Sequence, residues 1–305
     1  MTGNQALVER FESERTRLRS VAYRMLGSFS AADDVVQEAW IRLSQADAAD
    51  IENLGGWLTV VVSRLCLDAI RSQEARPEDP LGVRLPDPVV TRAGTLEPEH
   101  RALLADDVGL ALQVVIQELR PPERLAFVLH DIFAVPFDQI ASVVGSSTAA
   151  ARQLASRARR RVRNAGVEPD PDLPRQREVV EAFLAAAREG DLEGLLAVLD
   201  PECVLRADAG PLMPGLSQTV RGAEEVAGQA IRFSSRAPLA EHVLVNGAAG
   251  VIVEEAGRVV SLIGFTVVKG RVVAMDILAD SERLEGVMTG RPAWNGYDDG
   301  RSSET

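Results

Sequence analysis

A short segment rich in proline and aspartate, residues 166–174, divides the chain into two parts with different patterns of apolar residues. Strand-like spacing occurs only in the part that follows this segment. Upstream of it, apolar residues recur every three or four positions, as on one side of an α-helix. Downstream, helical stretches at 175–189 and 192–199 are followed by strand-like runs at 203–206, 242–246, 250–255, 259–268 and 272–278. This order predicts all-helical domains followed by one α+β domain.

Residues 76–99 divide the helical part in two. The stretch holds five prolines and two glycines between two helical regions, which is typical of a linker. We therefore expect a helical domain at 1–75, a linker at 76–99, a second helical domain at 100–165, a connector at 166–174, an α+β domain at 175–284 and a tail at 285–305.

The composition, 46% hydrophobic and 26% charged over 305 residues, is that of a folded globular protein. No apolar stretch approaches the ~18 residues of a membrane helix, and the N-terminal segment lacks the apolar centre of a signal peptide. We therefore expect a cytoplasmic protein without membrane contact. Cys66 and Cys203 lie in apolar stretches and only three histidines are present, so we expect no disulfide framework, metal or cofactor.

The net charge of −12 is distributed unevenly along the chain. Residues 166–305 carry 13 basic and 23 acidic side chains, a net of −10, whereas residues 100–165 carry nine basic and six acidic ones, a net of +3. Six arginines and no acidic residue lie between Arg152 and Arg163. A local basic stripe of this kind attracts a phosphate backbone whatever the charge of the whole chain.

The segment from Pro136 to Arg163 has the pattern of a helix-turn-helix, with a short helix, a break at Gly145 and a second helix capped by Ser147. We expect the helices to pack through Ile140, Ala141, Val144 and Leu154, and the second to seat closely through Ala149, Ala150 and Ala151. The candidates for base contacts are Thr148, Arg152 and Gln153, and those for phosphate contacts are Arg157, Arg160 and Arg161. The alternative is a helical hairpin whose arginines face solvent.

Helical patterns also mark the N-terminal domain. We expect one helix to begin at a capping box, Ser30 to Asp33, and another to run from Trp57 to Arg71. Arg64 and Arg71 lie away from the apolar side of the latter, which makes them candidates for DNA backbone contacts, with ordinary exposed arginines as the alternative. Trp40 and Trp57 have apolar neighbours at helical spacing, so core packing is favoured over stacking on unpaired bases.

These helices resemble parts of a known family. The segment from Ser30 to Leu43, SAADDVVQEAWIRL, is similar to the helix by which extracytoplasmic-function sigma factors hold the RNA polymerase clamp. Residues 56–72, GWLTVVVSRLCLDAIRS, are similar to the helix that meets the promoter minus-10 element, and the helix-turn-helix to the domain that reads the minus-35 element. The resemblance implies polymerase contacts by Asp33, Asp34, Gln37 and Glu38, with a solvated acidic face as the alternative.

The remaining part resembles the SnoaL-like domain fused to one branch of this family, in which helices pack on a curved antiparallel sheet as a cone. Its third helix is expected at 223–233, after Val220-Arg221-Gly222. Residues 84–88, RLPDP, are similar to that branch's Trp-Leu-Pro-Glu-Pro motif, with Arg84 and Asp87 as departures. Residues 208–210, DAG, and 280–284, DSERL, stand where the branch has Asp-Gly-Gly-Gly-Lys and Asn-Pro-Asp-Lys-Leu. The resemblance implies interdomain regulatory contacts by Leu85, Pro86, Asp87, Pro88, Asp208 and Gly210.

Together these features predict a sigma factor that brings core RNA polymerase to promoter DNA, is regulated in cis by its C-terminal domain, and has no enzymatic activity. Two alternatives stay open: a ligand-responsive helix-turn-helix repressor or activator, and a SnoaL-like enzyme fused to a DNA-binding module. For an enzyme, the residues able to transfer protons are Asp208, His242 and Asp276. The fold also leaves room for an unknown small ligand in the C-terminal domain.

Overall fold

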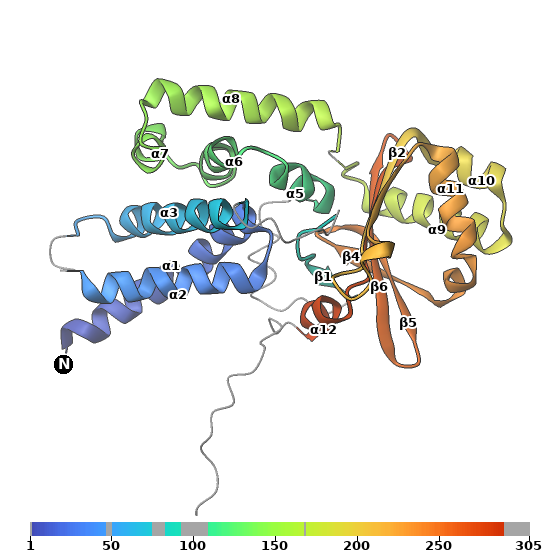
Figure 1. Cartoon of the computed structure of the whole chain (residues 1–305), viewed down its shortest axis with the longest axis horizontal. Helices are drawn as coiled ribbons and strands as arrows, with labels where there is room; N and C mark the ends of the chain where they lie inside the picture. The colour runs from blue at the N-terminus through green and yellow to red at the C-terminus, as the bar shows by residue number, and fades with distance from the viewer. Residues whose placement is uncertain (1, 47–50, 75–82, 93–108, 168, 290–305) are drawn as a thin grey trace, which may run out of the picture.

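The computed structural model describes residues 2–46, 51–74, 83–92, 109–167 and 169–289. Helices α1 to α8 form one half of the molecule, and a seven-stranded sheet with helices α9 to α12 forms the other (Figure 1). Within the described residues, none of the helices has the length and apolar character needed to cross a membrane. The predicted fold class, helical domains followed by an α+β domain, is confirmed.

Three helices make the N-terminal domain: α1 (Thr2–Leu26), α2 (Phe29–Gln45) and α3 (Leu54–Glu74). Gly27 adopts φ +71° and ends α1, so Ser28 is the first extended residue after the turn. The Ser28 hydroxyl accepts a hydrogen bond from the Ala31 amide (3.5 Å). The predicted start of this helix at Ser30 is therefore wrong, because the turn at Gly27 places the cap earlier.

The second helical domain contains α5 (Leu110–Gln117), α6 (Pro121–Phe127), a π-helical turn η2 (Val128–Ile132), α7 (Phe137–Val144) and α8 (Thr148–Ala165). The first residues of the expected second helical domain, 100–108, lie outside the described residues. Gly145 has φ +64° and ends α7, and the Ser147 hydroxyl accepts a hydrogen bond from the Ala150 amide at the start of α8 (3.2 Å). The predicted helix-turn-helix is therefore present.

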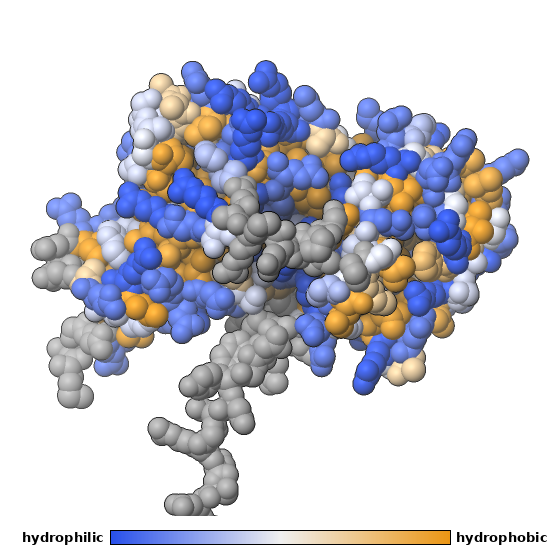
Figure 2. All heavy atoms as spheres, viewed as in Figure 1, coloured by the Kyte–Doolittle hydropathy of each residue, from blue (hydrophilic) through white to orange (hydrophobic). Residues whose placement is uncertain are grey.

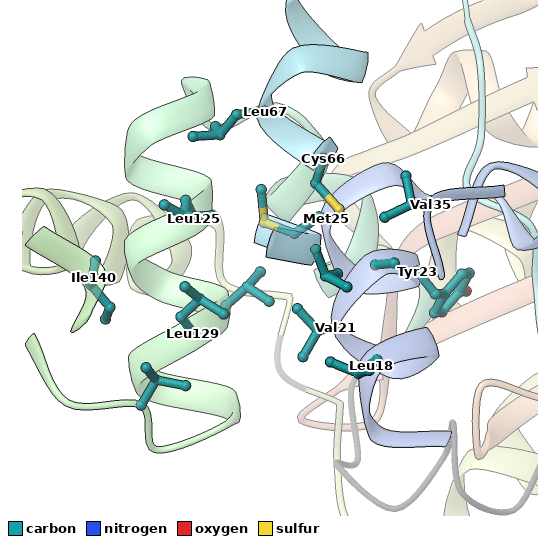
Figure 3. Packing of buried hydrophobic residues seen from close by; sticks show 14 of the residues in the cluster. Leu18, Val21, Tyr23, Met25, Val35, Cys66, Leu67, Leu125, Leu129 and Ile140 are labelled. Atoms are coloured by element: carbon teal, nitrogen blue, oxygen red, sulfur yellow. The ribbon is translucent and has the colours of Figure 1, made fainter. Parts of the chain in front are cut away.

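The two helical domains share one hydrophobic core. Leu18, Val21 and Met25 of α1 lie beside Leu125 of α6 and Leu129 of η2, and all five side chains are fully buried (Figure 3). Helix α3 also contacts α6 and α7. The linker thus joins two domains that are packed against each other.

The C-terminal domain is built on a sheet with strand order β1-β4-β5-β6-β7-β2-β3. Six of its strands come from this domain: β2 (Leu199–Asp208), β3 (Gln218–Arg221), β4 (Ala240–Val245), β5 (Ala248–Glu255), β6 (Arg258–Val268) and β7 (Arg271–Leu278). Neighbouring strands are antiparallel except for β2 and β7, which are parallel. Lys269 and Gly270 both have positive φ at the turn between β6 and β7, as expected for a tight hairpin.

Helices flank both faces of the sheet. Helices α9 (Leu173–Glu189), α10 (Leu192–Val198) and α11 (Ala223–Arg232) pack on one face, while α5 contacts β6 and β7 from the other. Helix α12 (Ser281–Thr289) follows β7. Strand β1 (Val90–Thr91) belongs to the linker and pairs with β4 at the sheet edge. The sequence did not predict this strand, because two residues are too few to show a period.

Candidate polymerase, nucleic-acid and interdomain surfaces

The outer side of α8 carries most of the residues predicted to contact DNA. The exposed ones are Arg152, Gln153, Arg157, Arg160 and Arg161, and Thr148 is half-buried at the start of the helix. The surface over this helix is largely hydrophilic (Figure 2). The helix therefore presents its basic side outward, as a recognition helix requires.

Small residues on the inner side seat α8 on the domain. Ala151, Ala155 and Ala158 are fully buried, at the spacings of four and three that share one helix face. Ala149, which we expected to take part in this packing, is exposed instead. Ile140 and Ala141 are buried, with Val144 and Leu154 partly buried against the same core, as expected for the contact between α7 and α8.

Two arginines of α8 form ion pairs within the domain. Arg159 lies 3.2 Å from the Asp131 carboxylate, and Arg161 lies 3.3 Å from that of Glu123, whose side chain is only 5% exposed. Burial raises the pKa of Asp131, and Arg159 opposes that rise. Arg161, a predicted phosphate contact, is thus engaged within the protein, whereas Arg157 and Arg160 project from the outer side.

A groove between α3 and α8 brings the predicted DNA contacts of both helical domains together. Arg71 of α3 lines it together with Gln153 and Arg157 of α8. Arg64, also on α3, donates a hydrogen bond to the Ser142 carbonyl of α7 (3.1 Å). Residues predicted to contact DNA from both helical domains therefore line one groove, while the rest of the basic side of α8 faces outward.

The residues predicted to bind polymerase divide into two groups on α2. Asp33 forms an ion pair with Arg19 of α1 (2.7 Å), and burial raises the pKa of this carboxyl while Arg19 lowers it. Asp34 and Gln37 are exposed, and Glu38 lies 2.9 Å from Arg42 one turn along the helix. Asp33 therefore joins α1 to α2, and the outward-facing part of the surface is Asp34, Gln37 and Glu38.

Ile41 extends this α2 surface, and sequence reasoning missed it. Its side chain is 41% exposed, although it is large and apolar. It follows Gln37 by four positions and Glu38 by three, which places all three on one side of the helix. The signal was present in that spacing, but the resemblance pointed only to the polar residues of this helix.

The linker is held by a network centred on Arg283 of α12. Its guanidinium contacts Asp87 of the linker (2.7 Å), Asp208 of β2 (2.6 Å) and the Leu85 carbonyl (2.6 Å). The Leu85 amide in turn donates to the Asp208 carboxylate (2.9 Å). Burial opposes the charge of Arg283, but the two carboxylates outweigh it and raise its pKa.

Asp87 also connects this network to the N-terminal domain. Its second carboxylate oxygen accepts a hydrogen bond from the Phe29 amide (2.8 Å), and its own amide donates to the Gly27 carbonyl (2.7 Å). The Tyr23 hydroxyl donates to the Asp87 carbonyl (2.6 Å), and burial raises the pKa of that hydroxyl to about 12. One linker residue thus touches both α1 and α2 at their turn and α12 of the C-terminal domain.

The expected interdomain residues converge on this network. Leu85, Pro86, Pro88 and Asp208 are buried, and Asp87 is half-buried. Gly210 donates its amide to the Asp208 carboxylate (3.1 Å), and with φ +70° a Cβ there would overlap the Asp280 carboxylate. Arg283 was not predicted as a member, although it lies within the DSERL segment that the sequence singled out.

The three residues considered for proton transfer are each paired with a different residue. His242 is exposed and lies 3.0 Å from Glu181, Asp276 is buried and paired with Arg206 (2.6 Å), and Asp208 belongs to the linker network. Asp276 shares its side of β7 with Ala274, which packs with α5.

Burial also raises the pKa of Cys203 to about 12, so this thiol is protonated at neutral pH.

The chain is similar to proteins of one family across both halves. Residues 10–76 match the model for Sigma-70 region 2, and residues 109–162 match that for Sigma-70, region 4. The ECF RNA polymerase sigma factor SigJ of Mycobacterium tuberculosis is 45% identical over 221 residues, which are 72% of this chain and 70% of SigJ. The probable ECF RNA polymerase sigma factor SigI of the same organism is 41% identical over 199 residues, 65% of this chain and 69% of SigI.

The solved structures include one that spans both halves. The crystal structure of the Mycobacterium tuberculosis extracytoplasmic function sigma factor SigJ has a TM-score of 0.72 to this chain at 36% identity. It covers 94% of this chain and 100% of that chain, so the similarity includes the C-terminal domain. The protein therefore belongs to the extracytoplasmic-function sigma factors of the sigma-70 family.

Proposed function

We propose that this sigma factor, which directs core RNA polymerase to promoters, is held in a closed form by its own C-terminal domain until polymerase or another signal opens it. The observation that supports this most is the position of Asp87, which contacts the turn between α1 and α2 and the Arg283 side chain of α12. The groove between α3 and α8 adds to it, because Arg71, Gln153 and Arg157, all predicted to contact DNA, line it together. Duplex DNA would have to enter this groove to reach Arg71 and the recognition side chains at the same time.

The proposed contacts with partners follow the exposed sides of three helices. Helix α2 grips the polymerase through Asp34, Gln37, Glu38 and Ile41. Helix α3 meets the minus-10 element, with Arg64 and Arg71 on the DNA backbone once the groove has opened. On α8, Thr148, Arg152 and Gln153 contact bases. Phosphates are contacted by Arg157, Arg160 and Arg161. For Arg161 this contact requires release of its ion pair with Glu123.

The proposed domain limits are those expected from the sequence: 1–75, 100–165 and 175–284, with the linker at 76–99, the connector at 166–174 and the tail at 285–305. Two details of packing refine them. Helix α9 begins at Leu173 with Asp172 as its cap, inside the expected connector. Residues 90 and 91 of the linker belong to the sheet of the C-terminal domain.

Run-off transcription with purified core polymerase tests the function directly. We expect promoter-specific transcripts only when polymerase and this protein are both present, and only weak duplex binding by the protein alone. A symmetric complex with a palindrome in the absence of polymerase would favour a repressor instead. Turnover of small ketones or esters by the purified protein would favour an enzyme, whose candidates Asp208, His242 and Asp276 are paired with Arg283, Glu181 and Arg206 in this structure.

Two substitutions on α8 should separate base reading from phosphate binding. Arg152→Ala is expected to relax the preference at one or two minus-35 positions, at ~1–3 kcal/mol per lost base contact. Arg160→Ala is expected to weaken binding on all sequences and to reduce the salt dependence by about one unit of slope. Holoenzyme binding to a promoter library at several salt concentrations measures both. Arg177→Ala, at an exposed position of α9, is the matched control, and equal losses for both α8 variants across the library would contradict this division.

A further inference from the structure

The C-terminal domain contains an apolar cavity of about 170 Å³ between the sheet and helices α9 and α11. Its wall is formed mainly by aliphatic, alanine and phenylalanine side chains, and the polar members are Gln218, Gln229, Ser261 and Arg236. Two further wall residues, Leu216 and Phe233, are 51% and 47% exposed and bring apolar surface to the outside. The domain thus offers an apolar space that opens toward solvent.

The charge of the wall indicates which molecules fit. Arg236 is the charged residue among those that line the cavity, and its guanidinium lies 2.8 Å from the Glu255 carboxylate and over the Phe233 ring. An ion placed inside would lose its hydration without meeting an unpaired opposite charge. A neutral molecule avoids that cost, and the amides of Gln218 and Gln229 or the Ser261 hydroxyl can bond to a polar group on it.

The size of the cavity indicates a single ring. Dry protein cavities of roughly 150 Å³ lined by apolar side chains bind benzene. This cavity is of that size, and its wall is apolar apart from the groups named above.

The same strands connect the cavity to the linker network. Along β2, Leu205 and Ala207 line the cavity, while Asp208 faces the other way and holds the linker. Ala279, also in the cavity wall, donates its amide to the Asp208 carbonyl (2.7 Å). Asp208 is paired with Leu278 in the adjacent strand. A molecule that shifts these wall residues therefore acts on the group that binds Leu85 and Arg283.

We propose that this cavity is a binding site for a small uncharged molecule with one apolar ring and a hydrogen-bonding group, and that its occupancy alters the docking of the linker at Asp208. The cavity by itself supports the binding of such a molecule. The effect on the linker rests on the proposed regulation in cis, so the two parts need separate measurements.

Ligand-observed NMR with the full chain tests the binding, with benzene, phenol, p-cresol and indole as probes and benzoate as the charged counterpart. We expect the neutral probes to bind and benzoate to be rejected. Ala230→Phe adds a ring to the cavity wall on α11 and should weaken p-cresol binding about tenfold or more. Glu225→Phe adds the same ring at an exposed position of this helix and should leave binding unchanged. Ala230→Leu, a smaller addition, serves if the phenylalanine variant does not fold.

Hydrogen exchange at the Leu85 amide measures the effect on the linker, because that amide is bonded to Asp208. We expect p-cresol to change the exchange rate of the Leu85 amide in the wild type and in Glu225→Phe but not in Ala230→Phe. Failure of all four neutral probes to bind, or equal binding to the wild type and both Ala230 variants, would overturn the site. Binding without any change at Leu85 would overturn the coupling. If transcription by a chain without the C-terminal domain equals that by the full chain, the proposed regulation is contradicted, but the proposed binding site is not.

Discussion

Replacement of Arg283 by methionine is expected to release the linker from the C-terminal domain while leaving both domains folded. The substitution keeps an apolar stem but leaves the Asp87 and Asp208 carboxylates side by side without their cation. Breaking a buried ion pair in this way costs about 3–5 kcal/mol, because the remaining charges stay desolvated. Both carboxylates are well covered, with exposed side-chain fractions of 14% and 4%.

Three measurements check this result. The Leu85 amide should exchange faster, the free energy of unfolding should fall, and run-off transcription should differ from that of the wild type at equal concentration. Arg258→Met is the matched control, since Arg258 is an exposed arginine of the same domain. Unchanged exchange at Leu85 in a folded Arg283→Met variant would show that the linker is held by its other bonds, such as the one from the Val89 amide to Asn246.

Charge reversal on α2 is expected to abolish most binding to core polymerase. In the double variant Asp34→Lys and Glu38→Lys, two outward-facing acidic groups become basic while the buried side of the helix is untouched. The ion pair of Glu38 with Arg42 is exposed and contributes only about 0.3–0.5 kcal/mol to the helix. We therefore expect the affinity for polymerase to fall tenfold or more, ~1.4 kcal/mol or above, with unchanged circular dichroism.

Co-purification with core polymerase and a titration by fluorescence anisotropy measure this loss. The matched control is the double variant Glu9→Lys and Glu12→Lys, which makes the same change of charge on the exposed side of α1. Equal loss of binding in both double variants would indicate that net charge rather than the α2 surface sets the affinity. Undiminished binding by the α2 variant would refute the assignment of this surface.

The closed arrangement gives the linker network a mechanical consequence. Asp87 caps the start of α2 through the Phe29 amide and is bound by Arg283 at the same time. When Arg283 releases it, the turn before α2, the helix proposed to bind polymerase, loses its tie to the C-terminal domain. If polymerase binding requires that release, as proposed, polymerase binding and linker docking are linked equilibria, and each changes the equilibrium constant of the other by the same factor.

Much of the secondary structure and one of the surfaces could be predicted from the sequence. The break at Gly145 and the cap at Ser147 predicted the helix-turn-helix because a glycine with positive φ and a serine hydroxyl act within one turn of chain. The hairpin at Lys269 and Gly270 is set in the same local way. The row of arginines on α8 was visible because helical spacing alone places side chains on one face.

The sequence by itself therefore determined most of the elements, their order and the charge on the faces of α2 and α8, all of which depend on residues within a few positions of one another. Only the tertiary structure decided which charges are paired. Arg161 meets a buried glutamate, Asp33 meets Arg19, and Arg283 meets an aspartate 196 positions away. Such pairs depend on distance through space, and the packing of elements within and between domains brings them together without leaving a period or spacing in the chain.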